Sequence, residues 1–189
     1  MRALATLSGT LLAASALFLA NEASAQLIIK NPGDHPPFRA ELEPHAVIVP
    51  WGGPLGYRYV GPADRGYFAG GAGFRATIKI ADPVIPRLNN TIGITFGLDI
   101  TSCEYCDYPY NRDHFSFWTP VGAQWTFFLT RDWSVFGEPG LILQSSGFYR
   151  DVWVAPMFEV GGRWHFKDKI TLTMRAGYPF VTVGVSFFI

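Results

Sequence analysis

The sequence predicts an all-β fold: an eight-stranded antiparallel, up-and-down β-barrel that crosses a membrane, preceded by a cleaved signal peptide. Three observations support this prediction. A single long apolar run lies at the N-terminus, and alternating apolar and polar residues recur through the rest of the chain. Hydrophobic residues make up 49% of the 189 residues, and charged residues only 16%, below the roughly 25% that is usual for soluble domains.

The N-terminal run has the features of a secretory signal peptide. A basic residue precedes the apolar residues 4–20, and residues 23–25 (Ala-Ser-Ala) fit a small-x-small cleavage site. A membrane-anchoring helix is the alternative, but the run is short for a span and rich in alanine. We therefore expect residues 1–25 to be removed on export, residues 26–40 to form a proline-rich periplasmic lead-in with little regular structure, and residues 41–189 to form the barrel.

Period-two alternation of apolar residues, which indicates a half-buried β-strand, divides the remaining chain into eight segments. An even number of strands leaves both termini on one side of the membrane, as single-chain barrels require. A turn at residues 177–179 joins the last two strands, and a polar loop is expected at residues 102–114. The predicted strands are residues 41–51, 67–81, 91–101, 115–129, 133–146, 152–166, 170–176 and 181–189.

The composition of the two strand faces distinguishes a membrane barrel from a soluble, lipocalin-like barrel. In the segment 91–101, Ile92, Ile94 and Phe96 share one face, whereas threonine, glycine and one aspartate share the other. A soluble barrel would usually expose a face rich in lysine and glutamate. Small residues instead suit the crowded lumen of an eight-stranded barrel. We therefore predict that the bulky apolar face contacts lipid.

Charged residues on the predicted inner faces are expected to meet in the lumen. Because buried charges persist only when they are paired, we predict an ion-pair network that fills the barrel. A gated polar conduction path and a catalytic site are the alternatives. The network residues are Arg75, Lys79, Asp99, Glu138, Glu159, Arg163 and Arg175, with Glu41 and Glu43 as further candidates.

The sequence contains few other signs of chemistry. Cys103 and Cys106 lie in the expected loop and are predicted to form a disulfide, because the exported chain meets an oxidising compartment. A metal site or a redox thiol is the alternative, but no second CxxC or histidine pair completes a metal site. No catalytic motif is present, so we predict no enzyme and no cofactor. The net charge is zero and no basic run occurs, so nothing indicates nucleic-acid binding.

Three prolines fall inside consecutive predicted strands: Pro120, Pro139 and Pro156. Each removes a donor from the ladder of backbone hydrogen bonds. The weakened wall is a candidate side passage by which a hydrophobic molecule moves between lumen and lipid. The alternative is that β-bulges absorb the prolines.

The signal peptide, the alternating strands and the terminal segment VTVGVSFFI resemble the small bacterial outer-membrane β-barrels of the OmpA-barrel, OmpX and OmpW kind, over residues 41–189. The resemblance implies an outer-membrane location, contact with lipid, and a non-enzymatic structural or surface role in the envelope. A narrow, porin-like channel or lateral-route transporter for small hydrophobic molecules, and an outer-leaflet lipid-modifying enzyme, are the alternatives. Recognition by the barrel-assembly machinery is implied for Val181, Val183, Val185, Phe187 and Ile189, although that family usually ends on an aromatic residue where Ile189 stands.

Overall fold

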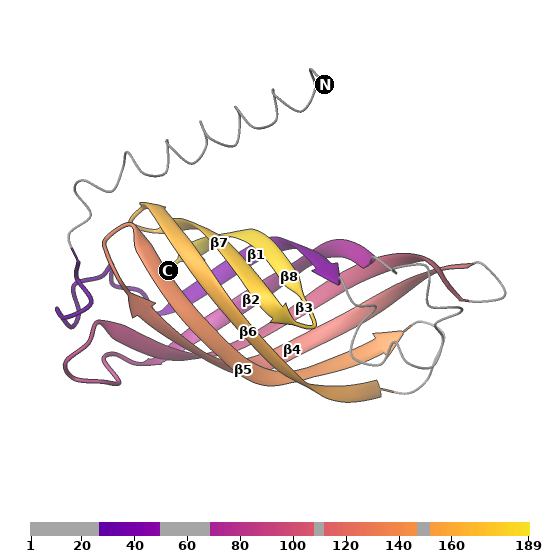
Figure 1. The fold of residues 1–189 in the computed structure, drawn as a ribbon, viewed down its shortest axis with the longest axis horizontal. Coiled ribbons are helices and arrows are strands. Elements are labelled where there is room, and N and C mark those ends of the chain that lie inside the picture. The colour runs from indigo at the N-terminus through magenta and orange to yellow at the C-terminus, as the bar shows by residue number, and fades with distance from the viewer. Residues whose placement is uncertain (1–26, 50–68, 108–111, 147–151) are drawn as a thin grey trace, which may run out of the picture.

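A computed structural model describes residues 27–49, 69–107, 112–146 and 152–189. Its eight strands form one closed barrel (Figure 1). No helix in the described part of the chain is both long enough and apolar enough to span a membrane. The strands are β1 (Ala40–Val49), β2 (Ala69–Ala81), β3 (Asn90–Asp107), β4 (Arg112–Phe128), β5 (Trp133–Ser146), β6 (Val152–Lys167), β7 (Ile170–Tyr178) and β8 (Val181–Phe188).

Each strand pairs antiparallel with the next, and β8 pairs with β1 to close the sheet. Ala46 of β1, for example, is opposite both Ala72 of β2 and Val183 of β8. Closure means that each of the eight strands has a neighbouring strand on both sides. The predicted eight-stranded, up-and-down antiparallel barrel is confirmed, and the architecture is that of the small barrels that the sequence resembles.

The outer surface of the barrel is apolar and the interior is polar. In β3, Ile94 is 48% exposed and Leu98 is 47% exposed, whereas Thr95 and Asp99 are fully buried. The same alternation continues through the other strands, with arginine and glutamate side chains buried inside the barrel. This distribution is the inverse of a water-soluble domain and matches a barrel whose wall is immersed in lipid.

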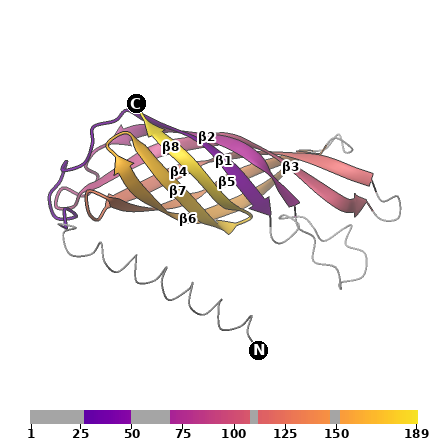
Figure 2. The same ribbon diagram turned by 90° about the horizontal axis from the view of Figure 1, so that it is seen from above.

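Strand boundaries follow the predictions closely except at one end of β3 and β4. The predicted loop 102–114 is largely strand, because β3 continues to Asp107 and β4 begins at Arg112. The extra residues pair with each other, as in the register Ser102 opposite Phe115 and Asp107 opposite Arg112. Pairing of backbone groups does not require an alternating side-chain pattern, so the polar composition concealed this extension. Figure 2 shows β3 and β4 projecting beyond the other strands.

Residues 27–39 cover the opposite end of the barrel, at the left of Figure 1, where the C-terminal strand also ends. We call this the terminal end, and the end with Val49 and Asp107 the loop end. The Ile28 amide donates to the Leu129 carbonyl over 3.0 Å, and the Asn89 amide donates to the Ile29 carbonyl over 2.7 Å. The segment therefore lies across the terminal end, held by backbone hydrogen bonds.

Candidate functional site: the charged interior of the barrel

Eight charged side chains from β1, β2, β3, β5, β6 and β7 converge inside the barrel. Every second residue of each strand points inward, so charged residues at these positions meet inside the barrel. All eight are at most 2% exposed. We call them the luminal charge cluster: Glu41, Glu43, Arg75, Asp99, Glu138, Glu159, Arg163 and Arg175.

Arg75 joins two carboxylates that face each other across neighbouring strands. Glu138 of β5 is directly opposite Glu159 of β6. Arg75 Nη1 lies 2.6 Å from Glu138 Oε1 and 2.6 Å from Glu159 Oε2. Its Nη2 lies 3.7 Å from Asp99 Oδ2. Because like charges opposite each other destabilise a sheet, this single guanidinium carries much of the local compensation.

Arg175 of β7 extends the network to β1. Its Nη1 forms an ion pair with Glu43 Oε1, and its Nε donates to Glu138 Oε2 over 3.3 Å. The second oxygen of Glu43 accepts a hydrogen bond of 3.0 Å from the Ser186 hydroxyl of β8. Glu138 thus receives donors from two arginines.

Arg163 of β6 binds Glu41 through a two-point contact. Its Nε and Nη2 donate to the two carboxylate oxygens over 2.9 and 2.6 Å, the bidentate geometry that is strongest for this pair. Arg163 Nη2 also donates to Gln124 Oε1 over 2.7 Å, and Gln124 Nε2 donates to Glu138 Oε2 over 3.1 Å. Gln124 therefore links the two halves of the network.

His45, which the sequence interpretation omitted, is hydrogen-bonded to Asp99 with an Nε2–Oδ1 distance of 2.7 Å. A glycine makes room for this contact. A Cβ atom at Gly73 would lie 1.8 Å from Asp99 Oδ1 and 2.7 Å from His45 Nε2. The inward register of Glu41 and Glu43 continues to His45, so strand parity alone could have found it.

The cluster contains an excess of acidic groups. Three arginines face five carboxylates, and each arginine reaches at least one of them. An aromatic ring adds to the compensation, since the Cζ atoms of Arg163 and Arg175 lie 4.1 and 4.9 Å from the centroid of Phe136. Gly161 accommodates this ring, because a Cβ there would lie 2.1 Å from Phe136 Cζ.

Lys79, predicted to belong to the luminal network, lies apart from it. Its Nζ is 2.8 Å from Asp82 Oδ2 at the terminal end and 4.7 Å from the centroid of the Phe38 ring. Strand parity indicates which face a residue occupies but not its depth, and Lys79 is near the end of β2. Asp82 is also 3.1 Å from Nε2 of His35, whose Nδ1 is 2.6 Å from Asn89 Oδ1.

Two apolar clusters lie on either side of the charges. At the loop end, Trp118 meets Phe180 edge to face with ring centroids 5.3 Å apart, and Phe180 is fully buried. This loop-end cluster consists of Val47, Val49, Trp118, Ile142, Ala155, Met157 and Phe180. The terminal-end cluster consists of Ile28, Phe38, Phe128 and Phe188. Among the described residues, buried side chains therefore occupy the interior near both ends as well as in the middle.

The three prolines singled out in the sequence do not share one face or one seam. Pro120 is buried, whereas Pro139 and Pro156 are exposed on the outer wall. Pairing between β3 and β4 is interrupted next to Pro120. Pairing between β4 and β5 is interrupted next to Pro139, between Gly122 and Trp125 of β4. A proline that lacks its N–H explains each interruption. A route through all three prolines therefore does not follow from their arrangement.

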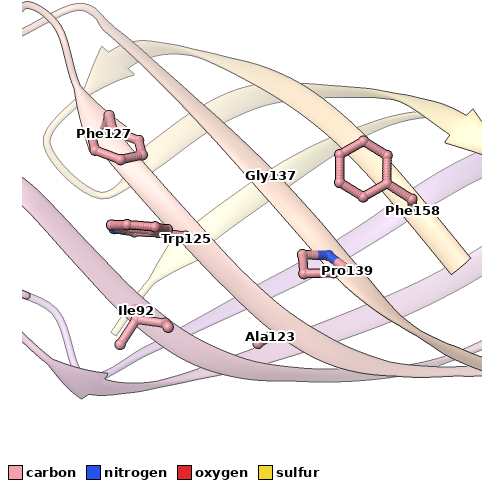
Figure 3. Close-up of a pocket in the computed structure, with 7 residues that line it drawn as sticks. All are labelled: Ile92, Ala123, Trp125, Phe127, Gly137, Pro139 and Phe158. Carbon is pink, nitrogen blue, oxygen red and sulfur yellow. The ribbon is translucent and has the colours of Figure 1, made fainter.

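We call the interruption of the β4–β5 ladder near Pro139 the β4–β5 gap. An apolar hollow of about 310 Å³ lies on the outer wall of the barrel at this gap (Figure 3). Trp125 and Phe127 extend from β4 on one side and Phe158 from β6 on the other, with β5 running between them. On the inner side of the same gap, Gln124 and Glu138 form the hydrogen bond described above. The lining residues are Ile92, Ala123, Trp125, Phe127, Gly137, Pro139 and Phe158.

The backbones of Cys103 and Cys106 belong to β3 rather than to a loop, and their side chains lie outside the described residues. The disulfide therefore stays a prediction. Within the described part of the chain, no group of three or more histidine, cysteine, aspartate or glutamate side chains has the arrangement of a metal site.

No family model matches the chain, and no curated protein matches it. Among solved structures, it is similar to the Yersinia pestis outer membrane protein Ail in a phospholipid bilayer nanodisc, with 9% sequence identity and a TM-score of 0.47. The match covers 80% of this chain and 99% of that chain.

Proposed function

We propose that this chain is a non-enzymatic protein of the bacterial outer membrane, exported by residues 1–25, whose barrel is a closed structural and surface element of the cell envelope. The terminal end would face the periplasm and the loop end the exterior, as in single-chain barrels with both termini inside. The filled lumen is the observation that carries this proposal. Arg75, Arg163 and Arg175 are among the largest fully buried side chains, and apolar clusters flank them at both ends.

A filled lumen predicts a barrel that folds in lipid but conducts no ions. The purified protein should migrate differently on a gel before and after boiling, as folded membrane barrels do, and should produce no stable conductance steps in a planar bilayer. Deleting the gene should alter the permeability of the outer membrane. Stable single-channel steps from heat-modifiable protein would contradict the structural role and favour the channel.

The β4–β5 gap favours a second candidate, a lateral route for small hydrophobic molecules. Its support is the loss of ladder pairing at Pro139 together with the apolar hollow on the lipid side. The Gln124–Glu138 hydrogen bond closes the inner side of this gap, so such a route would require that bond to open. Uptake of an apolar fluorescent dye by cells should then rise in Gln124→Ala and fall in Pro139→Thr, which restores the donor. Equal uptake in both variants and the wild type would exclude the route.

A further inference from the structure

The hollow on the outer wall has the composition of a site for hydrocarbon. Six of its lining residues carry apolar or aromatic side chains and the seventh is Gly137, which leaves the floor open. The only polar side-chain atom that they bring, Trp125 Nε1, already donates to Asn90 Oδ1 over 3.1 Å. The lining therefore offers no free polar side-chain group that would bind a polar or charged ligand.

The hollow is a recess in the wall because small residues form its floor. A Cβ atom built at Gly137 would meet no other atom within 4 Å, so the space above this residue belongs to no neighbouring side chain. Pro139 and Ala123 contribute little bulk beside it, while the aromatic side chains of Trp125 and Phe158 flank it from β4 and β6 (Figure 3). The result is a trough between aromatic walls rather than a flat part of the sheet.

The position of the trough along the barrel indicates which leaflet of the membrane it contacts. Ile92 is near the start of β3, and Trp125 and Phe127 are near the end of β4, so the trough begins close to the terminal end. From there it extends to Pro139 and Phe158, near the middle of β5 and β6. In the proposed orientation the terminal end faces the periplasm. The trough would then open into the inner leaflet, which consists of phospholipid, and away from the lipopolysaccharide of the outer leaflet.

We propose that this trough is a fixed binding site for one acyl chain of an inner-leaflet phospholipid. The inference rests on the proposed outer-membrane location. A volume of about 310 Å³ exceeds the 150 Å³ or so of an apolar cavity that holds benzene, which suits a stretch of hydrocarbon chain. An unfilled trough would forfeit dispersion contacts along its whole lining.

A second copy of the chain is a poorer occupant. A stable protein–protein interface uses about 20–30 residues on each side, whereas seven residues line the trough. The wall curves away on both sides because the barrel is closed. A narrow recess on a convex surface suits a flexible chain better than a protein face.

A matched pair of glycine variants tests the proposal. Gly137→Leu fills the trough, whereas Gly162→Leu adds the same side chain to an outward glycine of β6 whose nearest neighbour, the Ser134 carbonyl oxygen, lies 3.9 Å from the added Cβ. The mature chain and both variants would be refolded, checked for heat-modifiable migration, and incubated with palmitoyl-oleoyl phosphatidylglycerol or phosphatidylethanolamine in detergent. Native mass spectrometry would count the lipids that each barrel retains.

We expect one retained lipid on the wild type and on Gly162→Leu, and at least fivefold lower occupancy on Gly137→Leu. Because no charged side chain lines the trough, the two headgroups should be retained within about twofold of each other. Equal retention by both variants, a strong preference for one headgroup, or a dimer that Gly137→Leu dissociates would each overturn the proposal. Failure of the membrane location itself would appear differently, as a wild type that is soluble without detergent and shows no heat-modifiable band.

Discussion

Removing Arg75 should destabilise the barrel far more than neutralising Glu159, one of the carboxylates that it binds. Arg75→Met leaves Glu138, Glu159 and Asp99 with one less positive charge, and all three are fully buried. Removing one partner of a buried ion pair costs about 3–5 kcal/mol. Glu159→Gln instead relieves the repulsion between two facing carboxylates and keeps an oxygen that can accept from Arg75, so it should cost less than about 1 kcal/mol.

Urea unfolding of the barrel in lipid vesicles, followed by tryptophan fluorescence, gives the free energy of unfolding by linear extrapolation. Lys79→Met is the control, because the Lys79–Asp82 pair at the terminal end is partly solvent-exposed and such pairs contribute about 1 kcal/mol or less. If Glu159→Gln costs as much as Arg75→Met, the excess of carboxylates is not what makes Arg75 important. An Arg75→Met barrel as stable as the Lys79 variant would likewise show that Arg75 does not compensate the buried carboxylates.

Two further predictions concern single positions. Gly73→Ala should lower the free energy of unfolding by about 1–3 kcal/mol, because its Cβ would overlap Asp99, while Gly162→Ala should change it by less than about 0.5 kcal/mol; equal effects would contradict the packing argument. His35→Phe keeps a ring at the terminal end but loses two hydrogen bonds, so trypsin should cleave after Lys30 at least several times faster than in the wild type. An unchanged cleavage rate would show that His35 does not hold the N-terminal segment.

The strands and their two faces were predictable from sequence because both follow from a period of two. Ile94 and Leu98 point outward and Thr95 and Asp99 inward, as the alternation predicts. The position of a residue along the barrel axis, in contrast, is not encoded in this alternation. Lys79 has the parity of Arg75, yet only its place near the end of β2 allows it to reach Asp82 instead of the luminal charge cluster.

Features that depend on distant partners were not predictable in the same way. Residues 27–39 carry no strand pattern, but Phe38 and Ile28 find apolar partners where the barrel ends, and their burial covers that end. Gln124 is one of several polar residues in β4, and its role as a link between Arg163 and Glu138 exists only after the barrel closes. The sequence does contain the parity of such residues, which makes inward parity the best single indicator of the luminal site.

The last two residues of the chain should respond to substitution in opposite ways. Ile189 is 61% exposed on the outer wall, and its carbonyl accepts from the Arg39 and Ala40 amides, so its side chain is free to vary while its backbone extends the closing seam. Ile189→Phe, which gives the predicted assembly signal an aromatic end, should leave the yield of assembled barrel unchanged or raise it. Phe188 points inward, is 2% exposed, and stacks on Phe38 with ring centroids 4.6 Å apart.

Phe188→Ala should therefore cost about 3–5 kcal/mol, the usual effect of emptying a buried aromatic site, and should release residues 27–39 from the terminal end. The heat-modifiable fraction in outer membranes measures assembly, and urea unfolding of the refolded barrel measures stability. A marked loss of assembled barrel in Ile189→Phe, with normal stability once refolded, would contradict the expectation that an aromatic residue at position 189 suits the assembly machinery. If both variants lose assembly but only Phe188→Ala loses stability, the assembly machinery reads the terminal residue itself rather than the outward face of the strand.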